Sequence, residues 1–225
     1  MNPTLFGMYL SLLLPIVLVR RGWGWLIASL SVMGMVVLTQ SRGAMVAMAV
    51  STTWVLWHRT RWMGLGLLGL SLLVSLLSLG HLDWWGSSER VASLRAAVTT
   101  FLLQNDHAGY GHHPITGYGP GFLFGFIQNL GKGHGPLNDW HHLHNEWLQA
   151  WIEYGLIGVG FLLWGTWDIV QRVWRAQKTP LVIALTGILL AFTVNSLVQF
   201  PAHLWLTSSV GLLAYCGLYV VTTTA

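Results

Sequence analysis

The run "PLVIALTGILLAFTVNSLV" at residues 180–198 decides the fold class, because it carries no charged side chain anywhere along its length. A helix needs about 20 mostly apolar residues to cross the hydrocarbon layer, and lipid tolerates no unpaired backbone polar groups. A second apolar segment follows at 203–222, and a third precedes it at 146–167. We therefore predict an all-α integral membrane protein.

The composition favours the same class. Of the 225 residues, 54% are hydrophobic and 8% are charged, whereas soluble domains have about 25% charged residues. The net charge of +4 is scattered between apolar segments instead of being clustered with aromatic residues, which argues against a nucleic-acid partner. The single cysteine, Cys216, permits no intramolecular disulfide.

Seven largely apolar runs have lengths that suit a membrane span, although the third is short. They are 4–19, 23–39, 43–57, 62–80, 146–167, 180–198 and 203–222. The chain is thus predicted to comprise a four-helix membrane segment (1–80), one large loop (81–145) and a three-helix membrane segment (146–225). No positive residue precedes the first run and no small-residue cleavage site follows it, so we interpret it as a retained span.

Positive residues orient these spans, since connections rich in Lys and Arg stay in the cytoplasm. Seven of the eleven Lys and Arg residues fall in alternate short connections: Arg20, Arg21, Arg59, Arg61, Arg172, Arg175 and Lys178. The large loop between the fourth and fifth spans, with most of the histidines, is then predicted to face the opposite side.

Arg42 is unusual in this topology, because "QSRGA" (40–44) forms the tip of a predicted helical hairpin at the outer boundary. One interpretation is an arginine that reaches up to lipid phosphates. The other is an anion site, since a guanidinium suits phosphate and Gly43 lets the backbone approach closely.

The large loop contains an amphipathic helix, predicted over 87–104, with Arg90 in its first turn. A cation there opposes the helix dipole and gains little unless an anion is present. Next, "HHPITGYGPGFLFGF" (112–126) places Gly117 and Gly119 in a loop that permits close backbone approach to a ligand. No strand precedes these glycines, so a nucleotide-binding fingerprint is disfavoured.

Titratable residues gather in "HHLHNEWLQAWIEYGLIG" at 141–158. A helix that begins within 141–144 would place Glu146 and Glu153 on one face. The histidines suit either a metal site, although the HExxH pattern is missing, or a neutral imidazole that acts as a general base. A hydrated interfacial cluster is the third reading of the same residues.

The motifs together resemble the C-terminal part of the O-antigen ligase and polymerase superfamily. The ligase pattern, His, then Asn, Ser or Gln, nine residues, Gly, two residues and Gly, Thr or Tyr, is met by His144, Asn145, Gly155 and Gly158. Further agreement comes from "NPTLFGMYLSLLLP", "QSRGA", and "SERVASLRAA" followed by "PITGYGPGF". The resemblance implies a multi-pass protein of the bacterial inner membrane with a periplasmic active face.

The resemblance also implies roles for single residues. His144 matches the catalytic base that deprotonates an acceptor hydroxyl, and Arg42 and Arg90 match arginines that hold the donor diphosphate, with Arg95 as a further candidate. Supporting residues are Asn145, Gly155, Gly158, Gly117, Gly119 and His203. The family is regarded as metal-independent, so no metal or other cofactor is expected.

The expected donor is an undecaprenyl-diphosphate-linked glycan in the membrane lipid. The acceptor is the lipid A core for a ligase, a glycan for a polymerase or a protein side chain for a third relative, and we favour the ligase for its complete pattern. Family members are longer, so the chain is expected to be a fragment or a truncated relative that needs a partner. A non-catalytic protein, a transporter or an inactive fragment is the rival from another class.

Overall fold

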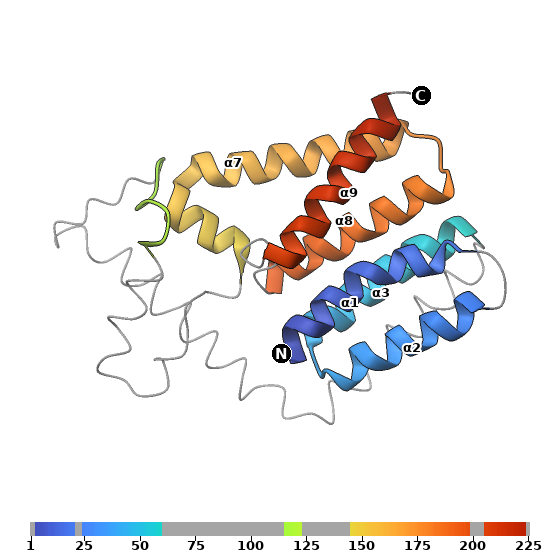
Figure 1. Cartoon of the computed structure of the whole chain (residues 1–225). Coiled ribbons are helices and arrows are strands. Elements are labelled where there is room, and N and C mark those ends of the chain that lie inside the picture. Colours follow the sequence, from blue (N-terminus) through green and yellow to red (C-terminus); the bar gives the residue numbers. More distant parts are fainter. Residues whose placement is uncertain (1–2, 21–23, 60–114, 123–144, 199–204, 224–225) are drawn as a thin grey trace. The chain divides into compact units, whose positions relative to one another are not determined.

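The computed structural model describes residues 3–20, 24–59, 115–122, 145–198 and 205–223, and these residues form six helices and no strand. The helices are α1 (Pro3–Leu18), α2 (Gly24–Leu38), α3 (Arg42–Arg59), α7 (Glu146–Arg175), α8 (Pro180–Val198) and α9 (Trp205–Thr223) (Figure 1). The all-α class is confirmed for the described part, and six of the seven predicted runs are helical. The fourth run, 62–80, and the amphipathic helix predicted over 87–104 lie outside the described residues.

Length and hydropathy single out one described helix as able to cross a membrane, over Pro180–Leu197 of α8. Three other apolar helices are shorter, at Pro3–Leu18, Gly24–Leu38 and Thr207–Thr223. The predicted spans therefore coincide with helices, while the number of membrane crossings stays a prediction.

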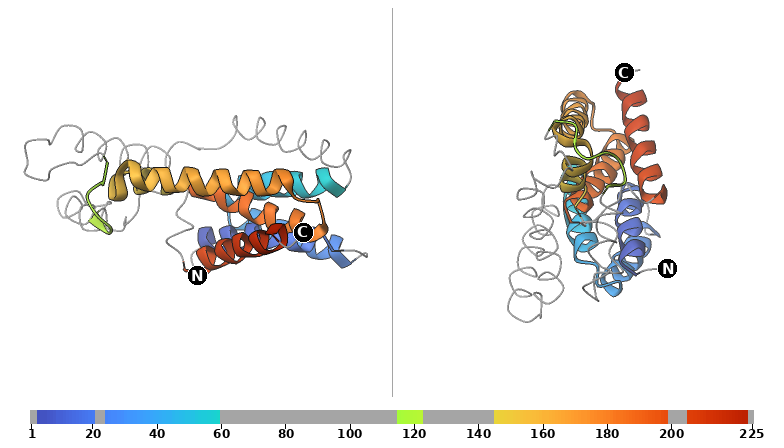
Figure 2. Two further views of the ribbon diagram at one scale, coloured as in Figure 1. Left: turned by 90° about the horizontal axis from the view of Figure 1, so that it is seen from above. Right: turned by 90° about the vertical axis from the view of Figure 1, so that its left-hand side faces the viewer.

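The chain divides into two compact units. Unit 1 comprises Met1–His81 and Asp168–Ala225, and unit 2 comprises Leu82–Trp167. Within unit 1, α1 contacts α2, α3, α8 and α9, and α8 also contacts α3 and α9. Successive helices of this bundle run in alternating directions, as the views in Figures 1 and 2 show for α1, α2 and α3.

Small and polar residues lie beside buried leucines and valines in the interior of unit 1. Gly187 of α8 is so close to α1 that a β-carbon there would lie 2.8 Å from the Cβ of Pro15. Asn195 is fully buried, and its Nδ2 donates to the Oγ of Ser11 at 3.1 Å and to the carbonyl of Ala191 at 2.9 Å. Small residues and interhelical polar bonds of this kind hold helices together in lipid.

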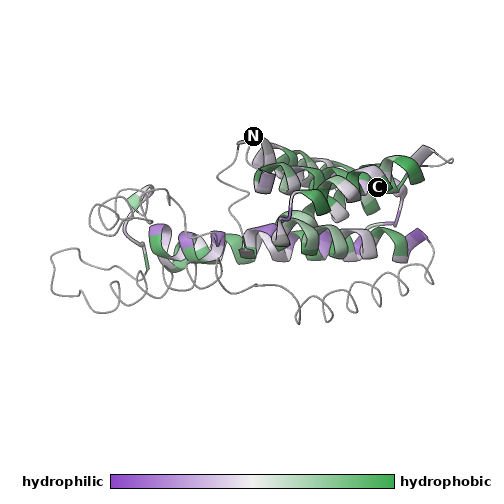
Figure 3. Cartoon of the chain, turned by 90° about the horizontal axis from the view of Figure 1, so that it is seen from below, coloured by the Kyte–Doolittle hydropathy of each residue, from purple (hydrophilic) through white to green (hydrophobic). Residues whose placement is uncertain are grey.

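Many other large apolar side chains face outward. On α2, Leu38 is 82% exposed and Ile27 is 71% exposed, and on α9 Leu213 is 70% exposed. Figure 3 shows that hydrophobic residues make up much of these helices. Water would make so much exposed apolar surface unfavourable, whereas a lipid environment would not.

One end of unit 1, which we call the basic end, collects the positive residues. Arg59 at the end of α3 donates through Nη1 to the carbonyl of Leu18 at 2.6 Å, and its guanidinium lies 4.2 Å from the ring centroid of Trp25 at the start of α2. Ile183, in the first turn of α8, packs in one cluster with Leu18 and Val55. The end of α1, the start of α2, the end of α3 and the start of α8 therefore meet here.

One predicted boundary was wrong. Arg172 and Arg175 lie in the final turns of α7 and not in a connection, because the helix continues past 167 as far as Arg175. The turn between α2 and α3 lies where it was predicted, since Gln40 has a φ of 53° and Arg42 is the first residue of α3.

Candidate functional site

Several predicted site residues lie outside the described part of the chain. They are His144, Arg90, Arg95 and His203, and the same holds for the side chain of Arg42. Their convergence on one cavity stays a prediction. The structure does describe Asn145, Gly155, Gly158, Gly117 and Gly119, which all belong to unit 2.

Asn145 is the N-cap of α7. Its Oδ1 accepts the backbone N–H of Leu148 at 2.9 Å, and its carbonyl accepts the N–H of Gln149 at 3.0 Å. An asparagine in this position satisfies a backbone donor that the first turn would otherwise leave unpaired. The helix begins at Glu146, which is the predicted start of the fifth run.

Gly155 interrupts α7 with a kink. Its φ of 62° and ψ of −154° are not helical and fall in a region that is essentially restricted to glycine. The carbonyls of Ile152 and Glu153 thereby become available, and they accept the N–H groups of Tyr118 at 2.9 Å and Gly119 at 2.8 Å. The first glycine of the ligase pattern is thus a bend in the backbone.

The loop at 115–122 docks on this kink through its backbone. Besides the two bonds above, Ile157 of α7 donates its N–H to the carbonyl of Ile115 at 3.1 Å. A β-carbon on Gly117, which has a φ of 70°, would lie 2.5 Å from the carbonyl carbon of Glu153, and one on Gly155 would collide with the carbonyl of Ile115. Both glycines are required for this backbone contact.

We expected the loop glycines to let a ligand approach the backbone. At Gly117 the backbone of α7 occupies that space instead. Gly119, with a φ of 99°, differs because no atom of the described residues lies within 4 Å of the position that a β-carbon would take. The rings of Tyr118 and Phe122 stack with centroids 4.3 Å apart on either side of Gly119 along the chain.

Gly158 has a local role in the same bend. A β-carbon there would lie 2.5 Å from the Cβ of Tyr154 and 2.9 Å from the carbonyl of Ala150. Because the helix changes direction at Gly155, residues that precede the kink lie against Gly158. A glycine at 158 therefore avoids a steric collision that the kink at Gly155 would otherwise cause.

Buried polar side chains line one face of α7 between the cap and the kink. Glu146, Gln149 and Glu153 are 6%, 3% and 2% exposed, and the spacing of three and four residues places them on one helix face. The Nε2 of Gln149 donates to the Oε1 of Glu153 at 3.3 Å. The sequence indicated the shared face of the two glutamates, but Gln149 and the burial of all three were missed.

Comparison with known proteins adds the family. The family model described as O-antigen ligase matches residues 25–163. The chain belongs to the O-antigen ligase family. No curated protein matches the chain.

The match includes α2, α3, the docked loop, the cap and the kink, and it ends within α7. Proteins of the O-antigen ligase family are membrane proteins, and the family supports a glycosyltransferase-like ligase or polymerase activity in lipopolysaccharide biosynthesis. The family acts in general on lipid-linked glycan donors and glycan acceptors. The nine residues between the Asn of the ligase pattern and its first Gly form the helical segment from the Asn145 cap to the Gly155 kink.

Proposed function

We propose that the chain is an O-antigen ligase of the bacterial inner membrane, which moves a glycan from an undecaprenyl-diphosphate carrier to a hydroxyl of the lipid A core. The observation that carries the proposal is the family match over residues 25–163. An O-antigen polymerase or a protein O-oligosaccharyltransferase would use the same donor with another acceptor, and these are the alternatives within the class.

His144 is the proposed general base. It directly precedes Asn145, so the cap fixes the chain one residue away from the imidazole. A neutral imidazole with a pKa near the working pH can take the proton of the acceptor hydroxyl. The acceptor oxygen then attacks the anomeric carbon, the bond from that carbon to the diphosphate oxygen breaks, and the configuration inverts.

Arg42, Arg90 and Arg95 are the proposed diphosphate-binding residues. Arg42 begins α3, where the positive end of the helix dipole and free N–H groups attract an anion. The Oγ of the preceding Ser41 is buried and has no hydrogen-bond partner in the described part of the chain. Guanidinium groups that stabilise the departing diphosphate would serve without a metal ion.

The arrangement of charges supports a site on the periplasmic face. The basic end of unit 1 gathers the ends of α1 and α3 with the starts of α2 and α8, and positive residues favour the cytoplasm. Arg42, at the start of α3, belongs to the opposite end of the bundle. The proposed diphosphate site is therefore on the outer side.

A transporter is less well supported. Transport paths place ionisable residues within several spans, whereas α1, α2, α8 and α9 contain no acidic or basic side chain. Glu146 and Glu153 lie in the first turns of α7, close to its proposed outer end.

The test is a lipopolysaccharide gel from host strains that lack either their ligase or their polymerase, each supplied with the gene for this protein or its His144→Ala form. Ladders restored in the ligase-deficient host and lost with alanine support a ligase. Restoration only in the polymerase-deficient host moves the assignment to a polymerase. If neither host recovers although the protein is in the membrane, and protein glycosylation is also absent, the transferase assignment is refuted.

A further inference from the structure

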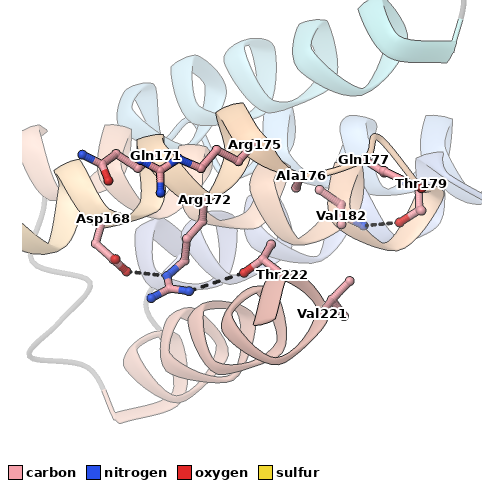
Figure 4. Close-up of a pocket in the computed structure, with 10 residues that line it drawn as sticks. All are labelled: Asp168, Gln171, Arg172, Arg175, Ala176, Gln177, Thr179, Val182, Val221 and Thr222. Atoms are coloured by element: carbon pink, nitrogen blue, oxygen red, sulfur yellow. Dashed lines mark hydrogen bonds and ion pairs between the residues drawn. The ribbon is translucent and has the colours of Figure 1, made fainter. Parts of the chain in front are cut away.

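A cavity of about 360 Å³ lies at the basic end of unit 1. Its walls come from the end of α7, the connection to α8 and the end of α9. Figure 4 shows Gln171, Arg172 and Arg175 on α7, Thr179 in the connection and Thr222 on α9. Ligand sites in proteins range from about 300 to 1,000 Å³. The cavity therefore has room for a small charged group.

Arg172 is held in place within this cavity. Its Nε donates to the Oδ2 of Asp168 at 2.7 Å, its Nη1 makes a long contact of 3.5 Å with the Oγ1 of Thr222, and its guanidinium lies 4.0 Å from the ring centroid of Tyr219. Asp168 also accepts the hydroxyl of Tyr215 at 2.8 Å. The carboxylate is thus engaged by two donors and fixes the orientation of the guanidinium.

Arg175 supplies a second cation, one turn later on α7. Its side chain is exposed, and the structure shows no ion pair for it among the described residues. Lys178 is directed elsewhere, because its Nζ donates to the carbonyl of Val173 at the end of α7. Two arginines against one aspartate leave the side chains that line the cavity with a net positive charge.

The surroundings indicate the level of a lipid headgroup. Trp174, between the two arginines in sequence, is 85% exposed, and exposed tryptophans concentrate where hydrocarbon meets headgroups. A planar guanidinium held in a fixed orientation matches the oxygen pairs of a phosphate.

We propose that this cavity binds a phosphate group, supplied by an anionic phospholipid of the adjoining leaflet. The site does not depend on the proposed glycan transfer, because it lies at the end of unit 1 opposite to Arg42. An anionic lipid held here would fix the end of α7 against α9. Soluble phosphate is the other source of the same chemistry, and the test below separates the two.

The test compares the purified full chain with Arg175→Gln and with Arg20→Gln as the matched control. Arg20 is also an exposed arginine, in the connection after α1 at the basic end, but it does not line the cavity. Native mass spectrometry would measure retention of phosphatidylglycerol against phosphatidylcholine, and thermal unfolding in detergent would measure stabilisation by inorganic phosphate. We expect Arg175→Gln to weaken phosphatidylglycerol binding by roughly tenfold and Arg20→Gln to leave it unchanged.

The outcomes are distinct. Selective retention of phosphatidylglycerol that depends on Arg175 supports a lipid source. Stabilisation by inorganic phosphate that depends on Arg175, without selective lipid retention, supports the phosphate site with a soluble source. Equal loss in both variants would mean diffuse attraction by surface charge and overturns the proposal, as does a wild-type chain that responds to neither phosphate nor phosphatidylglycerol.

Discussion

Replacing Gly155 by alanine should detach the loop at 115–122 from α7. The φ of 62° and ψ of −154° at Gly155 strain any residue with a β-carbon, by about 1–3 kcal/mol. The new methyl group would also collide with the carbonyl of Ile115. Relief of that collision requires the loop to move, which breaks three backbone hydrogen bonds, from Tyr118, Gly119 and Ile157, each worth about 0.5–1.5 kcal/mol net. The strain and the collision together raise the free energy of the docked state by about 3 kcal/mol, the upper end of the range for such strain, whereas the three hydrogen bonds are lost only on release and do not add to this cost.

Hydrogen exchange measures this directly. The amides of Tyr118, Gly119 and Ile157 donate the bonds that the substitution removes, so mass spectrometry of peptides covering 115–122 and 155–160 should show faster exchange. A cost of about 3 kcal/mol corresponds to roughly 100-fold faster opening when exchange follows the local equilibrium. Under the proposed function, the variant should also restore less lipopolysaccharide ladder, because the cap beside His144 and the kink share one short helical segment.

Gly160→Ala is the matched control on the same helix. Among the described residues, a β-carbon at Gly160 would meet no atom within 4 Å, and alanine is favoured over glycine in a helix by about 0.5–1 kcal/mol. Exchange in 115–122 should therefore be unchanged in this variant. If Gly155→Ala protects the Tyr118 and Gly119 amides as well as the wild type does, the backbone docking described here does not hold the loop.

Three further predictions concern the cap, the bundle and the basic end. Asn145→Ala should destabilise the first turn of α7 by about 1 kcal/mol while Asn145→Asp retains the cap; equal exchange at the Leu148 amide in both variants would contradict this. Asn195→Ala should lower the free energy of unfolding in detergent by roughly 0.5–2 kcal/mol through loss of the bond to Ser11, and an unchanged melting temperature would argue against that role. Asp168 lies beyond the predicted span, and the hydrogen bond from Arg172 lowers the pKa of its carboxyl below the ordinary 3.8. The ionised carboxylate therefore stabilises the fold above pH 3.8, and this contribution is lost as the pH falls through the lower pKa of the folded state. The melting temperature should accordingly fall less between pH 6 and pH 3 in Asp168→Asn than in the wild type. Identical pH profiles would refute the stabilising role of the Asp168–Arg172 pair.

The positions of the helices follow from the sequence, because apolar runs without charge have few other stable forms in lipid. Their ends follow less well. The end of α7 extends beyond the apolar run because Arg172 pairs with Asp168 one turn earlier, so charged residues can remain helical there. Its start depends on Asn145, and an asparagine beside histidines can equally be read as a site residue or as a cap.

The candidate site illustrates the same difficulty. Gly155 and Gly158 were identified from a pattern, but their role depends on the loop at 115–122, which contacts α7 across a long separation in sequence. Nothing in the local residues of either segment specifies that pairing. From the sequence, Gly117 was expected to allow a ligand to approach the backbone. A glycine indicates only that some group lies close to it, and here that group is the backbone of α7.

The spacing in the ligase pattern now has a physical reason. Nine helical residues between Asn145 and Gly155 rise about 13.5 Å and turn the helix face by about 100° per residue. One residue more or fewer would rotate the capped end relative to the kink and would move Glu146 off the buried face that it shares with Gln149 and Glu153. Because the loop at 115–122 is fixed to the kink, the spacing also fixes the position of the Asn145 cap relative to that loop. A constant spacing is therefore what we expect if the residue before the cap has to meet a substrate at one defined point.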